Sequence, residues 1–214
     1  MKLTQTMLGL AALSAVAAAP AGAADPAAAN LHFAVLRNGS PIGTMTTIVR
    51  RDGKGVVAET ATHIRVKIAY VSVYRFDQTE TEHWADGQFV DMSAKTNDNG
   101  TVHEVTATAD RDAIKIVTDG NATEADRSAI PASLWNPALL KKATALNAND
   151  GSIMKLHVVD RGDEQLDLDG RTVKTHHYSI DSSFSQDVWY DANNQLVKVE
   201  LRGSDGSKIE YEPN

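Results

Sequence analysis

The sequence contains no cysteine among its 214 residues. Disulfides, thiolate nucleophiles and thiolate metal sites are therefore excluded. A lipid anchor attached to a cysteine behind a leader peptide is excluded for the same reason. The chain must be stabilised by its hydrophobic core, and its length suffices for one domain or one large decorated sheet.

Positive charge is also scarce. Lysine and arginine number 21 against 28 acidic residues, which gives a formal charge of −7. The basic residues form no cluster that would override this total. Electrostatic binding to nucleic acid or to an anionic membrane surface is therefore not expected.

The first 24 residues have the pattern of a secretory leader. Lys2 precedes an apolar run from Met7 to Ala19, and Ala21-Gly22-Ala23 is a small-x-small cleavage site. An uncleaved anchor is the alternative, but the run is short for a membrane span and lacks a stop-transfer charge cluster, so stable insertion is not expected. We predict a periplasmic protein, cleaved near Ala23 or Ala24, with one β-rich domain over residues 25–214.

Alternating residues predict strands through most of the mature chain. From Val56 to Phe76 the even positions are apolar or hydroxyl-bearing, whereas the first odd positions are charged. One strand of that length would be unusual, so we expect a bend or bulge near Ile68–Val73. Turn signals then recur at Asn38-Gly39, Asp86-Gly87, Asn97-Asp98-Asn99-Gly100, Asp119-Gly120 and Arg161-Gly162-Asp163.

This spacing predicts an all-β, mainly antiparallel fold of ~11–13 strands, built as a large curved sheet or open β-barrel. Residues 122–131 have no periodicity and read as a loop. One short helix is expected to begin at Pro137, capped by Ser133 or Asn136, and to cover one end of the sheet.

Acidic and aromatic side chains gather on one face of the TETEHW segment. Glu80, Glu82 and Trp84 are two residues apart and share that face, so an inward Trp84 brings a carboxylate with it. Burial would raise the pKa of that carboxyl, as in acid–base catalysts. The alternatives are an ion pair of Glu82 with Arg65, Lys67 or Arg75, or an exposed edge strand.

The histidines give no local metal-binding pattern. His176 and His177 are adjacent, so on a strand they point to opposite faces and cannot chelate one ion. A zinc site of His83, His103 and Glu82 would have to assemble from separate strands, and no ligand spacing supports it. The sequence also lacks G-x-S-x-G and a calcium-loop spacing. It therefore predicts no catalytic residue, no metal and no cofactor.

Aromatic residues are only 6% of the chain, yet several fall in the strands that are expected to enclose the core. Such residues, with a few polar tips, are typical of ligand cavities in curved sheets and equally of ordinary cores. The candidate ligand-binding residues are Tyr74, Glu82, Trp84, Trp135, His177, Trp189 and Tyr190.

Several segments together resemble a family of uncharacterised secreted bacterial proteins classed as a domain of unknown function. They are PIGTMT, VYRFDQTETEHWADGQFVDMSAKTNDNG, SLWNP and DVWYDANNQLVKVEL. The positions that carry the resemblance are Tyr74, Glu82, Trp84, Thr96, Asn97, Gly100, Trp135, Asn136, Trp189 and Tyr190. It implies a periplasmic, β-rich, partly open barrel and supplies no catalytic residue. More distantly, the expected fold is similar to periplasmic lipoprotein carriers, a likeness of fold alone.

Three hypotheses for function follow. The first is a non-enzymatic protein that holds a lipid or other apolar or amphipathic small molecule on the concave face of the sheet. The second is an envelope hydrolase or isomerase in which Glu82 is an acid or base, with His177 as a possible second group. The third is a module that recruits an envelope protein partner through an exposed strand edge.

Overall fold

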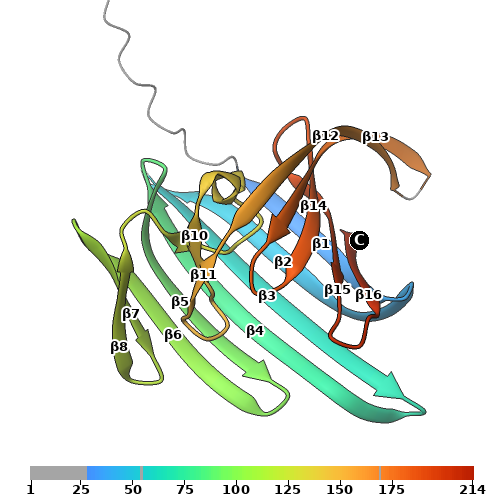
Figure 1. Ribbon diagram of the computed structural model, residues 1–214, viewed down its shortest axis with the longest axis horizontal. Helices are drawn as coiled ribbons and strands as arrows, with labels where there is room; N and C mark the ends of the chain where they lie inside the picture. Colours follow the sequence, from blue (N-terminus) through green and yellow to red (C-terminus); the bar gives the residue numbers. More distant parts are fainter. Residues whose placement is uncertain (1–27, 54, 169) are drawn as a thin grey trace, which may run out of the picture.

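The computed structural model describes residues 28–53, 55–168 and 170–214. The predicted leader, residues 1–24, lies outside them. The fold is one antiparallel sheet of thirteen strands in the order β12-β13-β14-β15-β16-β1-β2-β3-β4-β5-β6-β7-β8, with a second sheet of three short strands, β11-β10-β9 (Figure 1). The prediction of a large, mainly antiparallel sheet is confirmed.

The elements follow one another through the described chain. They are β1 (Ala29–Arg37), β2 (Ser40–Asp52), β3 (Gly55–Ile68), β4 (Val71–Ala85), β5 (Gln88–Asp98), β6 (Thr101–Ala109), β7 (Ala113–Thr118), β8 (Asn121–Asp126), β9 (Ile130–Pro131), the 3₁₀ helix η1 (Pro137–Lys141), β10 (Thr144–Leu146), β11 (Ile153–Lys155), β12 (His157–Leu168), β13 (Arg171–Asp181), β14 (Ser185–Asp191), β15 (Leu196–Arg202) and β16 (Lys208–Pro213).

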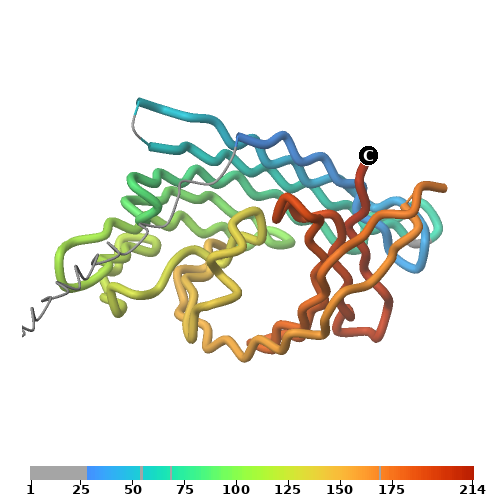
Figure 2. The backbone as a smooth tube through the Cα atoms, turned by 90° about the horizontal axis from the view of Figure 1, so that it is seen from above, coloured from blue at the N-terminus to red at the C-terminus, as the bar shows by residue number. Residues whose placement is uncertain are grey.

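The large sheet curls but does not close, since β12 and β8 remain its two outer strands. The segment with β9, η1, β10 and β11 lies on the concave side, between the two ends of the sheet (Figure 2). Its buried Ile130, Leu139 and Leu146 belong to the same core cluster as residues of β1–β7 and β13–β15. This segment therefore fills the interior that the open sheet would otherwise leave empty.

Period-two alternation is the reason these segments form strands. Along β4 the even positions from Gln78 to Trp84 are buried, and the odd positions are exposed or half-buried. Four predicted turns place an asparagine or aspartate and the following glycine at positive φ, as two-residue hairpins require. These pairs are Asn38-Gly39, Asp86-Gly87, Asn99-Gly100 and Asp119-Gly120.

The expected bend near Ile68–Val73 is wrong, because the chain reverses there. Ile68 pairs with Val71, and Ala69 and Tyr70 form a two-residue turn with φ of 47° and 70°. Neither residue is one that normally signals such a turn. The alternation continues across the turn, so β3 and the first residues of β4 read as one strand.

Tyr70→Gly is expected to raise the free energy of unfolding by about 0.5–1 kcal/mol, because glycine relieves the cost of positive φ while adding some freedom to the unfolded chain. Tyr70 is 101% exposed, so its side chain contributes no burial to lose. Urea unfolding measures the change. Tyr70→Ala is the control, since it removes the ring but keeps Cβ; equal stabilisation by both variants would show that backbone strain is not the cause.

Three further expectations need correction. Residues 122–131 are not all loop, since β8 extends the sheet by pairing with β7. Residues Arg161-Gly162-Asp163 are not a turn, because β12 runs through them with a bulge opposite β13. The short helix begins at Pro137 as predicted, but it is a 3₁₀ helix, and its cap is Asn136 rather than Ser133. The Asn136 side chain accepts from the Ala138 N–H at 3.0 Å.

Candidate functional site

Glu82 is the most deeply buried acidic side chain among the described residues, with an exposed fraction of 0%. Its position on the inward face of β4 follows from the alternation that also buries Trp84. Of the three cationic side chains proposed as its partners, Arg65 and Arg75 instead pair with Asp77 at 2.7 and 2.6 Å, and Lys67 is exposed on β3. The ion-pair and exposed-edge alternatives for Glu82 are therefore wrong.

Two indole groups satisfy the Glu82 carboxyl. Trp84 Nε1 donates to Oε2 at 2.8 Å, and Trp135 Nε1 donates to Oε1 at 3.0 Å. The two indoles meet edge to face, with centroids 5.9 Å apart, and Phe89 packs against Trp84 at 5.7 Å. Trp135 precedes η1, so this carboxyl links the covering segment to the sheet.

Glu80 lies beside Glu82 on the same face and is 8% exposed. Ser133 Oγ donates to its Oε1 at 3.3 Å, and the two carboxyls are hydrogen-bonded to each other. Burial and the neighbouring Glu82 raise the pKa of Glu80 well above its usual value. Burial also raises the pKa of Glu82, although hydrogen bonds from Ser133, Trp135 and Trp84 oppose this. Two close carboxyls in a dry site titrate as a coupled pair, because ionising one makes it harder to ionise the other.

A cavity of about 240 Å³ adjoins this carboxyl pair. Glu80 lines it, whereas Glu82 and Trp84 lie behind the wall. Its apolar lining comes from neighbouring strands in the middle of the curled sheet, from the loop before β14 and from the covering segment, and includes Leu31, Met45, Phe76, Trp135, Met154, Phe184, Leu201 and Tyr211. Polar groups of Thr47, Thr60, Thr62, Gln78 and Asn149 complete the floor. Phe184 is 44% exposed, so the cavity meets solvent near β14.

Two other predicted residues lie near this site. Tyr190 is buried, and its hydroxyl donates to the Leu134 carbonyl at 2.8 Å, next to Trp135. Tyr74 lies on the same face of β4 as Glu82 but near the hairpin tip, where burial and a hydrogen bond to Asp98 raise its pKa. Neither lines the 240 Å³ cavity, although Tyr190 and Trp135 both line a second hollow of about 810 Å³.

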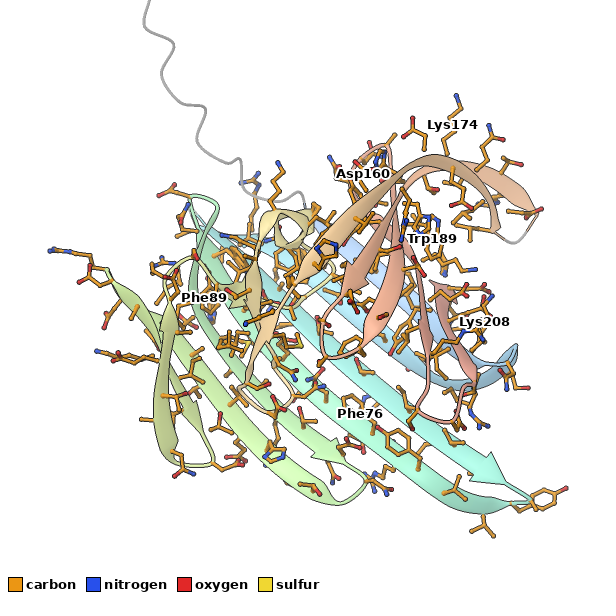
Figure 3. All side chains as sticks on the ribbon, in the orientation of Figure 1. Phe76, Phe89, Asp160, Lys174, Trp189 and Lys208 are labelled. Atoms are coloured by element: carbon orange, nitrogen blue, oxygen red, sulfur yellow. The ribbon has the colours of Figure 1, made fainter. Side chains whose placement is uncertain are left out.

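His177 and Trp189 do not join the predicted wall. They pair across β13 and β14 with rings stacked at 4.4 Å, on the face opposite Tyr178 and Tyr190. Trp189 Nε1 donates to Glu164 at 2.8 Å, and Lys198 lies over its ring. Figure 3 places Trp189 far from Phe89, which packs beside Trp84. His177 contacts Glu164 and Asp187, whereas Glu82 contacts Trp84 and Trp135, so the structure does not bring the two residues together.

Four other histidines, His63, His83, His103 and His176, contact acidic side chains. His83 contacts Asp91 at 2.7 Å and His103 contacts Asp119 at 2.6 Å, so neither approaches Glu82 as the zinc hypothesis required. Within the described ranges, no group of three histidine or acidic residues is arranged to hold a metal ion. Asp160 and Asp163 flank both nitrogens of His176 and raise its pKa.

Sequence reasoning missed most of the cavity. Gln78 and Glu80 share the face of Glu82, so their alternation could have included them in the site. Ser133 and Tyr211 carry no such signal, because they reach the cavity from a loop and from the final strand. Nothing in their local sequence indicates that they face β4.

Fold and site together define a β-barrel-like protein, open at one side, with an interior cavity and a buried carboxyl pair. The chain belongs to the family described as "Domain of unknown function (DUF6134)", whose model matches residues 33–214. This confirms the resemblance to an uncharacterised β-rich family. No curated protein matches the chain.

A solved structure has a similar fold. It is described as a "Beta-barrel-like Protein of Domain of Unknown Function DUF1849 from Brucella abortus". The TM-score is 0.64 at 12% identity, covering 86% of this chain and 96% of that one. At this identity the likeness concerns the fold alone. In the part of the chain that the structure describes, no helix is both long and apolar enough to cross a membrane.

Proposed function

We propose that this chain is an exported periplasmic protein that binds one small amphipathic molecule in the 240 Å³ cavity, with Glu80 as the polar anchor. The observation that carries the proposal is the composition of the lining, which is apolar except for a floor of hydroxyl and amide groups and one carboxyl. Small-molecule sites are concave and mostly apolar, with a few convergent polar groups. The leader-like pattern of residues 1–24 supports export.

The volume limits the ligand. An engineered apolar cavity of about 150 Å³ binds benzene, so a cavity of about 240 Å³ suits a ligand of roughly ten non-hydrogen atoms. A complete diacyl lipid is several times larger. The proposed ligand is therefore a short amphiphile or a single short chain rather than a whole phospholipid.

The second hollow is a weaker candidate despite its larger volume. Its lining includes Lys141, Asn193 and Asn194, all half-buried or exposed, and it mixes both signs of charge through Lys141 and Asp160. It shares only Leu31 and Trp135 with the first cavity. This more polar and charged lining offers an amphiphile a smaller share of apolar contact.

Native mass spectrometry of the protein purified from the periplasm tests the proposal. We expect a bound mass of small-molecule size that disappears on denaturation. Thr62→Phe places a ring in the cavity and should remove the bound mass. Thr44→Phe, on the exposed opposite face of β2, is the matched control and should retain it. A clean unliganded mass for the wild type, or retention by Thr62→Phe, would contradict binding in this cavity.

A second candidate is an envelope hydrolase or isomerase. It is favoured by one observation, the buried carboxyl pair without a cationic contact, with Glu80 at the cavity surface. A carboxyl whose pKa is raised toward neutral can act as general acid or base. In that case Glu80 rather than Glu82 would meet the substrate, because Glu82 lies behind the wall. A clean unliganded mass in the experiment above would favour this candidate over storage or carriage.

A further inference from the structure

The residues that line the 240 Å³ cavity have an unusual balance of charge. Among those described, Glu80 is the one carboxyl, and neither lysine, arginine nor histidine is present. The remaining titratable group is Tyr211, whose pKa is raised to about 12 by burial. The tyrosine is therefore neutral, and the cavity contains no positive group to receive an anion.

Behind the wall, the contacts of the carboxyl pair are also without a cation. Glu82 accepts from two indoles, and Glu80 accepts from Ser133. These donors are neutral, so they stabilise a carboxylate without cancelling its charge. The pair thus holds acceptor oxygens beside a desolvated, mostly apolar space, where an opposite charge is attracted more strongly than in water.

Aromatic and sulfur groups around the cavity complement a cation further. Phe76, Trp135 and Tyr211 contribute rings, and Met45 and Met154 contribute thioethers. Faces of aromatic rings attract ammonium groups that have lost part of their hydration shell. Thr60 and Thr62 add hydroxyl oxygens that can accept from N–H groups.

We propose that the molecule bound in this cavity is a small cationic amphiphile, a protonated amine with a short hydrocarbon body. The ammonium lies against Glu80, and the hydrocarbon contacts Met45, Phe76 and Leu201. This inference rests on the proposed binding function and adds the charge of the ligand. A carboxylate amphiphile is disfavoured by the same charges, and a neutral alcohol gains only the apolar contacts.

Binding of the amine also displaces a proton. Burial and the neighbouring Glu82 raise the pKa of Glu80 in the empty cavity, whereas a cation at Glu80 favours its ionised form. No histidine, lysine or arginine lines the cavity beside Glu80, so the carboxyl pair is the group that releases it. Binding of the amine should therefore strengthen as pH rises from mildly acidic to neutral.

Isothermal titration calorimetry with three probes of equal chain length tests the inference. The probes are octylammonium, octanol and octanoate, each of roughly the ten non-hydrogen atoms that the cavity suits. Octylammonium is expected to bind at least about tenfold more tightly than octanol, and octanoate should bind more weakly than both. Titrations in buffers of different ionisation enthalpy should detect proton release with octylammonium alone.

The variants assign the effect to the site. Glu80→Gln should reduce octylammonium binding to the level of octanol without changing octanol binding, and Thr62→Phe should abolish both. Should Glu80→Gln fold poorly, the order of the three probes on the wild type still decides the question. Equal binding of octanol and octylammonium, or tightest binding of octanoate, overturns the cationic ligand but leaves the binding function. Binding of none of the three overturns both.

Discussion

Glu82→Ala is expected to lower the free energy of unfolding by about 4 kcal/mol. The substitution leaves the indole N–H groups of Trp84 and Trp135 buried without acceptors, and each such donor costs about 1–3 kcal/mol. It also opens a hole where a fully buried side chain stood, which adds a cavity cost of similar size. Loss of the buried carboxylate charge offsets part of the total. Urea unfolding followed by tryptophan fluorescence measures the change.

Glu104→Ala supplies the control for the loss of a glutamate from a strand. Glu104 is exposed on β6 and pairs with Lys95 at the surface, where such pairs contribute about 1 kcal/mol at most. Trp135→Phe removes one indole donor while leaving Glu82 in place, so the double variant measures the coupling between these two residues. A cost for Glu82→Ala no larger than that of Glu104→Ala would show that the indole contacts add no stability.

The half of this site that lies on β4 could be predicted from sequence. Alternation places Glu80, Glu82 and Trp84 on one face, and the burial of Trp84 carries the carboxylates inward with it. Local spacing therefore predicted that a buried Trp84 brings a buried acid with it. It could not choose between an ion pair and neutral donors, because that choice depends on which side chain, distant in the sequence, contacts the acid.

Trp135 and Ser133 are the distant side chains that contact the two glutamates, and both are neutral donors. Each lies 53 residues from the glutamate that it contacts, in a segment whose path over the sheet has no periodic signature. The prediction of a covering element at Pro137 was correct, yet it could not say that Trp135 would reach Glu82. Contacts of this kind arise from the curl of the sheet, which no single strand encodes.

The errors have a similar origin. The aromatic wall was assembled by residue type, so it included Trp189, whose odd position places it on the outer face with His177. The hairpin at Ala69 and Tyr70 was missed because its strain falls on residues that normally avoid positive φ. In both cases the pairing between strands determined the structure, against what the local sequence pattern indicated. The register of the strands shows this pairing.

The carboxyl pair should also make stability depend on pH in an unusual direction. Folding raises the pKa of Glu80 above its ordinary 4.5, because of burial and of Glu82. At a pH between 4.5 and the raised pKa of folded Glu80, the folded protein holds a proton that the unfolded chain has released. The free energy of unfolding therefore falls as pH rises through this window, by about 1 kcal/mol per pH unit for one proton.

Other acids act in the opposite direction and at lower pH. Contacts with His63, Arg65 and Arg75 depress the pKa of Asp77 below its ordinary 3.8. This carboxylate stabilises the fold above that value and loses its contribution as pH falls toward its folded pKa. Above about pH 5 it is ionised in both states, so it adds no slope in the window where Glu80 titrates.

Glu80→Gln isolates the contribution of the pair, because every other titrating group is shared by the two proteins. The difference in unfolding free energy, variant minus wild type, should grow more positive as pH rises above 4.5, by about 1 kcal/mol per pH unit until the folded pKa is passed. Denaturant titrations at each pH measure it. A flat difference for Glu80→Gln would mean that Glu80 keeps an ordinary pKa, and a falling difference would mean that folding favours its ionised form. In either case the carboxyl pair would not hold the proton whose release accompanies binding of an amine.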